Sequence, residues 1–291
     1  MRPTTLFVAA FLIAAIARTH ADDDFSKEVV KPTPLGHQLT MLEGAGGNMT
    51  ALTGPDGTLL IDDDFAPMAP KIIEQLKALK GDSPRYIVNT HFHYDHTGGN
   101  EVFGKTATII AADEVRQRLA TEQTLWKKQH PAEPPQALPT LTYQTELTLH
   151  LNGQDIKIVH LPHGHTDGDT VVFFDGAASL GDLYFSGMFP IFHPEHNGSL
   201  EGYIKNLNTV IARVKDSDKI VPGHGPLSSK TDLVKYRDMI VASRDTVKKA
   251  VRKHKSLADV QRAGLDKKWD EFSHGYLTTD KWLALVYNAE K

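Results

Sequence analysis

Four side chains that can bind a metal ion lie within six positions of one another: His91, His93, Asp95 and His96. The first two histidines are two residues apart, so on an extended segment their side chains would point the same way. The Asp/His pair follows at once and could aim at a second point only if the chain turns, which the Gly98-Gly99 pair permits. Imidazole and carboxylate groups suit divalent transition metals, and the run therefore predicts half of a two-metal site.

Three later places offer residues for the other half. The loop at 162–169 contains His163 and His165, and a Gly-Asp pair places Asp182 within an otherwise apolar segment. A carboxylate there needs a partner, because burying it alone would be costly. The third place is His224, which stands between two glycines.

Each candidate ligand is expected at or near the end of a strand. Apolar segments at 86–89, 156–161 and 219–221 precede His91, His165 and His224, and a strand is expected over 179–185 around Asp182. Amphipathic or charged helices are expected over 67–80, 113–124, 200–214 and 229–255. Strand-end loops commonly carry binding sites in layered folds, so these elements predict one mixed domain that gathers the ligands.

The composition excludes several classes of function. The chain has 291 residues, a formal net charge of -4 and no cysteine. The charge is too mild to indicate binding of nucleic acid or membrane, and disulfides, thiolate ligands and cysteine nucleophiles are absent. We therefore expect a small-molecule substrate, whereas the oligomeric state stays open.

The first 21 residues have the features of a secretory signal. A basic start is followed by an apolar run from Leu6 to Ala17, and by small residues around a cleavage site after Ala21. The expected organisation is a signal peptide over 1–21, an extended arm over 22–35, a metal-binding domain over 36–227 and a helical C-terminal extension over 228–291 that packs on the same domain. We expect a periplasmic or secreted protein.

The motifs together resemble the metallo-β-lactamase superfamily, from about Gly36 to Leu227. The resemblance depends on an aspartate closing the second strand of a hairpin and on four motifs in the family's order: His-x-His-x-Asp-His at 91–96, Gly-His-Thr at 164–166, Gly-Asp at 181–182 and Pro-Gly-His-Gly at 222–225. It implies a four-layer αββα sandwich, of the α+β class, with the metals at one edge between two sheets.

The resemblance also implies a role for each matching residue. His91, His93 and His165 would hold one metal, Asp95, His96 and His224 would hold a second, and Asp182 would bridge them. The implied cofactors are two Zn²⁺ ions per chain, although iron or manganese would accept the same ligand types. A metal-bridging hydroxide would attack the substrate, and Asp95 would orient it and accept its proton. By the same resemblance, Asp62 would fix the orientation of a ligand.

Four other residues are weaker candidates for the site. His163 is expected to be a loop residue rather than a ligand. His193 and His196 lie in a loop that could line the substrate entrance, and Tyr184 could point toward the site as an oxyanion donor, although a packing role is the simpler expectation. The pocket itself is expected to be shaped by loops at 44–48, 126–140 and 187–199.

The departures from the family pattern bear on the substrate. Classical β-lactamases of this fold place Cys or Ser where Asp182 stands, and the group with Cys has a lactam-binding Lys where this chain has Phe185. The sequence favours a zinc hydrolase of a lactam, lactone, ester or thioester, in the manner of glyoxalase II and lactonases. The alternatives are a β-lactamase proper and a mononuclear iron dioxygenase of the same fold.

Overall fold

The computed structural model describes residues 24–125 and 128–291. The expected signal peptide over 1–21 lies outside the described residues, as do residues 126 and 127 of the expected substrate loop. Within the described part, no helix is both long enough and apolar enough to cross a membrane.

The first sheet has seven strands. Its order is β1 (Lys31–Gly36), β2 (Leu39–Glu43), β3 (Met49–Leu52), β4 (Thr58–Ile61), β5 (Pro84–Val88), β6 (Thr108–Ala112) and β9 (Leu141–Tyr143). The pairs from β1 to β4 are antiparallel, and those from β4 through β5 and β6 to β9 are parallel. The parallel strands direct their carboxyl ends toward one edge of the sheet.

The second sheet has six strands. They are β10 (Glu146–Leu151), β11 (Gln154–His160), β12 (Thr170–Phe174), β13 (Ala177–Ser179), β14 (Lys219–Val221) and β15 (Ser228–Ser229), in that order. All neighbours are antiparallel except β13 and β14, which are parallel. A separate hairpin pairs β7 (Gln123–Leu125) with β8 (Lys128–His130).

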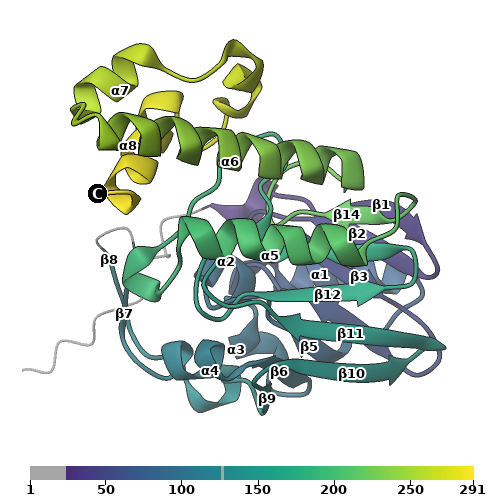
Figure 1. Ribbon diagram of the computed structural model, residues 1–291. Helices are drawn as coiled ribbons and strands as arrows, with labels where there is room; N and C mark the ends of the chain where they lie inside the picture. The colour runs from purple at the N-terminus through teal and green to yellow at the C-terminus, as the bar shows by residue number, and fades with distance from the viewer. Residues whose placement is uncertain (1–23, 126–127) are drawn as a thin grey trace, which may run out of the picture.

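Eight α-helices accompany the sheets in the described residues. They are α1 (Ala69–Ala78), α2 (Tyr94–Thr97), α3 (Asn100–Phe103), α4 (Asp113–Leu119), α5 (Leu200–Arg213), α6 (Lys230–Arg252), α7 (Leu257–Ala263) and α8 (Thr279–Ala289). Short 3₁₀ helices include η4 (Gly181–Leu183), η5 (Pro194–His196) and η6 (Lys267–Phe272). Figure 1 shows α6 lying alongside α5, with α7 and α8 at the far end from the sheets.

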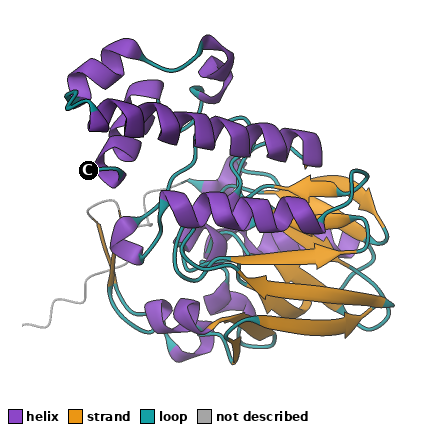
Figure 2. Cartoon of the chain, viewed as in Figure 1, coloured by secondary structure: helices purple, strands orange, loops and turns teal. Residues whose placement is uncertain are grey.

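Alternating burial along the strands produces the layers. In β4, Leu59 and Ile61 belong to the core between the two sheets, whereas Leu60 packs with α1 on the outer face of the first sheet. In β12, Val172 faces the same central core and Val171 faces the helices over the second sheet. Because successive side chains point to opposite faces, apolar runs such as these are buried on both sides. The four-layer αββα sandwich is confirmed, as Figure 2 shows.

Two expected elements differ from the structure. Within the segment expected as an arm over 22–35, residues 31–35 belong to β1, which pairs with β2 at the edge of the first sheet. The strand expected over 179–185 ends at Ser179, because Gly181 has φ +50 and begins η4. The apolar residues after it are buried in the core beneath α5 and α6 instead of in the sheet.

Candidate metal centre

The turn that separates the two pairs of ligands at 91–96 begins before the glycines. His93 is extended, at φ -66 and ψ 146, and α2 starts at the next residue, so Asp95 and His96 lie on its single turn. Gly98 and Gly99 have ordinary negative φ values. A Cβ on Gly99 would lie 2.4 Å from the carbonyl oxygen of Asp63. The expected turn is present, but it does not need the conformational freedom of these glycines, which instead permit close packing of α2 against the strand end at Asp62–Asp64.

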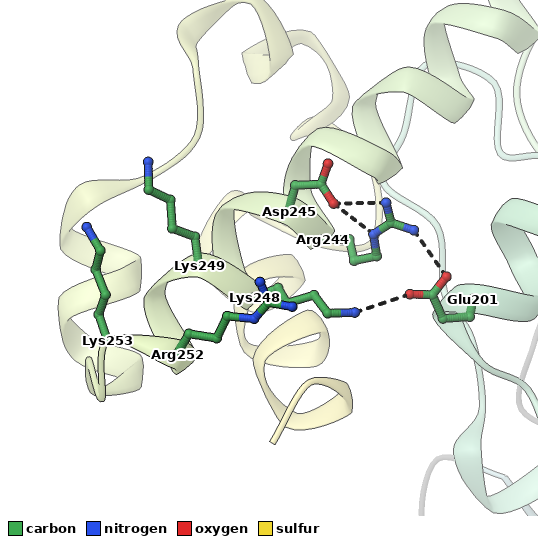
Figure 3. A pocket seen from close by; sticks show the side chains of 7 residues that line it. All are labelled: Glu201, Arg244, Asp245, Lys248, Lys249, Arg252 and Lys253. Carbon is green, nitrogen blue, oxygen red and sulfur yellow. Dashed lines mark hydrogen bonds and ion pairs between the residues drawn. The ribbon is translucent and has the colours of Figure 1, made fainter.

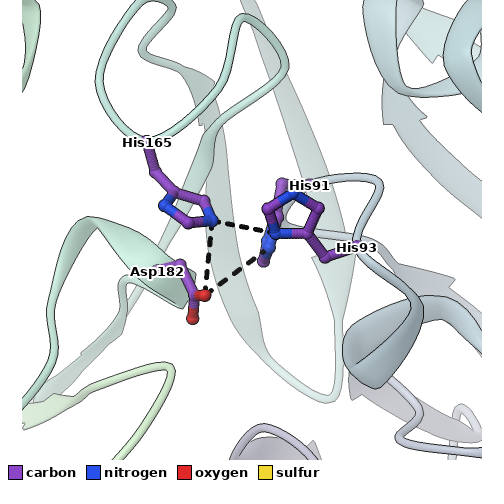
Figure 4. Close-up of side chains that lie close together, drawn as sticks. All are labelled: His91, His93, His165 and Asp182. Atoms are coloured by element: carbon purple, nitrogen blue, oxygen red, sulfur yellow. Dashed lines mark hydrogen bonds and ion pairs between the residues drawn. The ribbon is translucent and has the colours of Figure 1, made fainter. Parts of the chain in front are cut away.

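The first group brings together His91, His93, His165 and Asp182, all of them buried. Figure 4 shows the three rings and the carboxylate converging. His93 Nδ1 lies 2.9 Å from His165 Nε2, and Asp182 Oδ2 lies 3.4 Å from His165 Nε2 and 3.7 Å from His91 Nε2. These residues come from the loops after β5 and β11 and from η4.

The protonation states of the first group favour a bound cation. Burial lowers the pKa of His91 and His93 well below the usual value, and lowers that of His165 to about 4. His165 Nδ1 donates to the carbonyl of Ile191 at 2.7 Å, so its Nε2 carries the lone pair that faces Asp182. His91 Nε2 is buried and has no hydrogen-bond partner among the described residues. Three neutral imidazoles beside a carboxylate fit a divalent metal ion.

The second group contains Asp95, His96 and His224. His96 Nδ1 donates to Asp62 Oδ2 at 2.8 Å, which leaves its Nε2 directed at Asp182 Oδ1, 3.2 Å away. His224 Nε2 lies 3.2 Å from Asp95 Oδ2 and 3.4 Å from Asp182 Oδ1. Burial by itself lowers the pKa of His224. The nearby carboxylates, chiefly that of Asp182, outweigh this effect and raise the pKa to about 9. The same carboxylates would favour a cation at this place.

Asp182 is shared by the two groups through different oxygens. Its Oδ2 faces His91 and His165, whereas its Oδ1 faces His96 and His224. Gly223 allows this approach, because a Cβ there would lie 2.1 Å from Asp182 Oδ1. The carboxylate can therefore contribute one oxygen to each of two metals.

Asp62 supports ligands of both groups. Besides His96, it accepts from the backbone N–H of Thr90 at 2.7 Å and from the Thr90 hydroxyl at 2.8 Å. That hydroxyl lies 3.1 Å from His91 Nδ1, so it can accept the ring N–H while donating to Asp62. Buried and fully engaged, Asp62 fixes the tautomer of one ligand directly and of another through Thr90.

The remaining predicted residues divide into two kinds. His193 lies beside the first group, with its ring centroid 4.9 Å from that of His93, and with Glu195 and His196 it forms a third cluster. Tyr184 is not at the site: its hydroxyl bonds Ser228 Oγ at 2.7 Å, and its ring packs on Tyr236. His163 Nδ1 bonds the carbonyl oxygen of Asn197.

Sequence reasoning gave no site role to two aromatic residues that contact His224. Phe185 stacks on the His224 ring at 5.3 Å and 15°, and Tyr276 contacts the same ring edge-on at 5.6 Å. Phe185 was considered only as the replacement for a lysine. Tyr276 lies 52 residues beyond His224, and no local pattern signals a contact made by tertiary packing.

A hollow of about 540 Å³ elsewhere on the molecule is lined by charged side chains rather than by histidines (Figure 3). It lies where α5 meets α6, and Glu201 in it is paired with Arg244 at 3.1 Å and with Lys248 at 3.8 Å. The described residues that line it include no histidine: Glu201, Arg244, Asp245, Lys248, Lys249, Arg252 and Lys253. The chemistry of metal binding is therefore concentrated at the strand ends.

Comparison with known proteins assigns the chain to a family. The model of the metallo-beta-lactamase superfamily matches residues 42–224, and the chain belongs to that superfamily. Among curated proteins, it is 25% identical over 182 residues to a probable metallo-hydrolase of Methanocaldococcus jannaschii, covering 59% of this chain and 84% of that protein. It is 28% identical to a hydroxyacylglutathione hydrolase of Pelagibacter ubique, covering 48% of this chain and 51% of the relative.

Solved structures agree on the fold. A metallo-beta-lactamase with a HARLDQ motif from Cronobacter sakazakii matches with TM-score 0.62 and 22% identity, over 80% of this chain and 96% of that one. A stereoselective inverting sec-alkylsulfatase from Pseudomonas sp. matches with TM-score 0.68 and 14% identity, over 89% of this chain. The chain spans about half the length of that sulfatase, since 50% of it is covered.

Proposed function

We propose that this protein is a dinuclear zinc hydrolase that cleaves a carbonyl-centred bond in a lactam, lactone, ester or thioester. The observation that carries the proposal is the orientation of Asp182, which directs one carboxylate oxygen at each group of histidines. Membership of a superfamily that includes the two hydrolase relatives supports the reaction class.

The residues of the chain divide the work. When bound, a pair of divalent ions would supply Lewis acidity and lower the pKa of a bound water toward ~7. The side chain of Asp95 is 22% exposed, against 5% for Asp182, so it faces the opening of the site. Asp95 would orient the attacking water and accept its proton. Phe185 is buried and stacks on the His224 ring, which fixes the orientation of that imidazole.

The decisive experiment combines metal analysis with a hydrolysis screen. The protein, purified without added metal and then loaded with zinc or iron, is assayed against a chromogenic cephalosporin, a homoserine lactone, a thioester, an aryl phosphodiester and an alkyl sulfate. We expect two zinc ions per chain and turnover of a carbonyl substrate. One tightly bound iron with oxygen consumption would refute the hydrolase and support the dioxygenase alternative.

Asp182→Ala tests the bridge directly. It should reduce the bound metal to one ion or fewer per chain and lower kcat/KM at least about a hundredfold, since a ligand matters more than the outer partners of a metal site. Asp175→Ala is the matched control, because that aspartate is exposed and pairs with His37 and Lys215. Two full equivalents of metal in Asp182→Ala would contradict the bridging role.

We also propose that the protein acts outside the cytoplasm. The support is the apolar run from Leu6 to Ala17 before small residues at positions 19 and 21. N-terminal sequencing of protein recovered from the periplasm or medium should read from Asp22. A chain that keeps Met1 and stays in the cytoplasm would exclude export.

A further inference from the structure

The C-terminal extension brings an exposed tyrosine to the metal centre. Tyr276 lies between η6 and α8, and its hydroxyl is 3.4 Å from His224 Nδ1. Its ring also meets Phe185 edge-on at 6.3 Å. Tyr276 is 57% exposed. Its side chain is therefore accessible to solvent while it contacts His224 of the second group.

The role of His224 determines which way the Tyr276 hydroxyl proton points. His224 Nε2 faces the carboxylates of Asp95 and Asp182, so as a metal ligand it keeps its proton on Nδ1. That N–H then donates to the tyrosine oxygen, which acts as the acceptor. The O–H of Tyr276 consequently remains available, and it has no other hydrogen-bond partner among the described residues.

Packing holds Tyr276 in this position. The backbone N–H of Phe189 donates to the carbonyl of Phe272 at 2.9 Å, and Met188 pairs with Ser273 as an isolated bridge. A Cβ on Gly275 would lie only 2.4 Å from Met188 Cγ, so the backbone just before the tyrosine is pressed against this segment. Met188 and Phe189 follow Phe185 closely in the chain, so their contacts link the C-terminal extension to the residue that stacks on His224.

We propose that Tyr276 donates a hydrogen bond to the bound substrate, so that the C-terminal extension contributes a substrate-binding residue. The group it fits is a carbonyl or carboxylate oxygen attached to an apolar body, because the phenol O–H is a donor and the tyrosine ring, 57% exposed, offers apolar surface beside it. The inference rests on the proposed metal-binding role of His224.

The test uses a probe that does not have to react. Wild type, Tyr276→Phe and Tyr287→Phe are loaded with cobalt(II), and each is titrated with benzoate while the visible absorption of the metal is followed. Tyr287 is the matched control because it lies in the same extension and its hydroxyl donates to the carbonyl of Lys255 at 3.0 Å. Metal content and kcat/KM on the best substrate are measured in parallel.

We expect Tyr276→Phe to keep its full metal content while its benzoate Kd rises and its kcat/KM falls, each by about tenfold, as for one lost hydrogen bond. Tyr287→Phe should match wild type. Unchanged benzoate affinity in Tyr276→Phe would overturn the inference. So would a loss that disappears after correction for unbound metal, because the tyrosine would then act only by holding His224.

The same data separate this inference from the proposed function. If the wild type hydrolyses none of the substrates, the hydrolase proposal is refuted. If Tyr276→Phe nevertheless binds benzoate more weakly than the wild type, the tyrosine contact is still supported. Failure of the wild type to bind cobalt would refute the metal assignment and, with it, the proton argument for Tyr276.

Discussion

Asp62 holds one ligand from each metal group, and its replacement by asparagine is expected to weaken the two sites unequally. One oxygen accepts from His96 Nδ1 and from the Thr90 hydroxyl, and the other accepts from the Thr90 backbone N–H. An asparagine has a single acceptor oxygen. In one orientation the asparagine NH₂ group would face the backbone N–H of Thr90, and in the other it would face Nδ1–H of His96. Each orientation therefore sets two donors against each other.

The size of the effect follows from these contacts. Partners that orient metal ligands are typically worth 10–100-fold in metal affinity, which corresponds to about 1.4–2.7 kcal/mol. We expect this loss at the second site, where His96 loses its charged acceptor or changes tautomer. At the first site, Asp62 affects His91 only indirectly, through the Thr90 hydroxyl, which lies 3.1 Å from His91 Nδ1. The loss there should stay below about tenfold, as for one neutral hydrogen bond.

Competition between the protein and a zinc-chelating dye gives the two dissociation constants. Thr90→Val removes the hydroxyl next to His91 and should reverse the order, with the first site weakened more than the second. The reasoning would be refuted by wild-type constants for both sites in Asp62→Asn, or by a first site that suffers more than the second in that variant.

Two further predictions concern buried and exposed neighbours of the site. Burial raises the pKa of Asp64 to about 6 despite hydrogen bonds from three backbone N–H groups. Because this folded-state pKa exceeds the unfolded value of 3.8, the protonated Asp64 carboxyl stabilises the folded state. Its contribution is complete below about pH 4 and is lost as the pH rises through 6. Urea unfolding of metal-free protein should show wild type losing about 2 kcal/mol relative to Asp64→Asn between pH 4 and 6.5, and a constant difference would contradict this. His163→Ala should keep kcat/KM within about twofold, as expected for a surface residue, whereas His165→Ala should abolish turnover; equal losses would mean that the wrong histidine of that loop was chosen as the ligand.

The residues that the structure gathers into two candidate metal-binding groups could be named from the sequence because each is part of a short local pattern. His91, His93, Asp95 and His96 lie within one turn and its approach, and the glycines beside His165, Asp182 and His224 mark places where the backbone must pass closely. A local pattern also misled in one case. Gly98 and Gly99 were expected to permit a turn through their flexibility, but their small size serves contact with the backbone near Asp63 and Asp64.

The parts that could not be predicted depend on packing between distant segments. The apolar run at 183–185 resembles a strand, and only the positive φ of Gly181 and burial beneath α5 and α6 show why the strand stops at Ser179. The position of Tyr276 depends on Met188 and Phe189, which lie far from it in sequence. Periodicity reports which side of an element is buried, but not which element covers it.

The extension is better understood as a fixed wall of the site than as a lid. Phe272, Trp282, Leu283 and Val286 are all buried in the same core as the residues under α5. Trp282 stacks on Phe189 at 5.6 Å, and its indole N–H donates to Ser243. Burying each of these four side chains is worth about 1.5–3 kcal/mol, far more in total than the few kcal/mol that separate alternative conformations of a protein. Lifting Tyr276 away by undocking the extension would require losing most of that energy, so substrates must fit the opening as the extension shapes it.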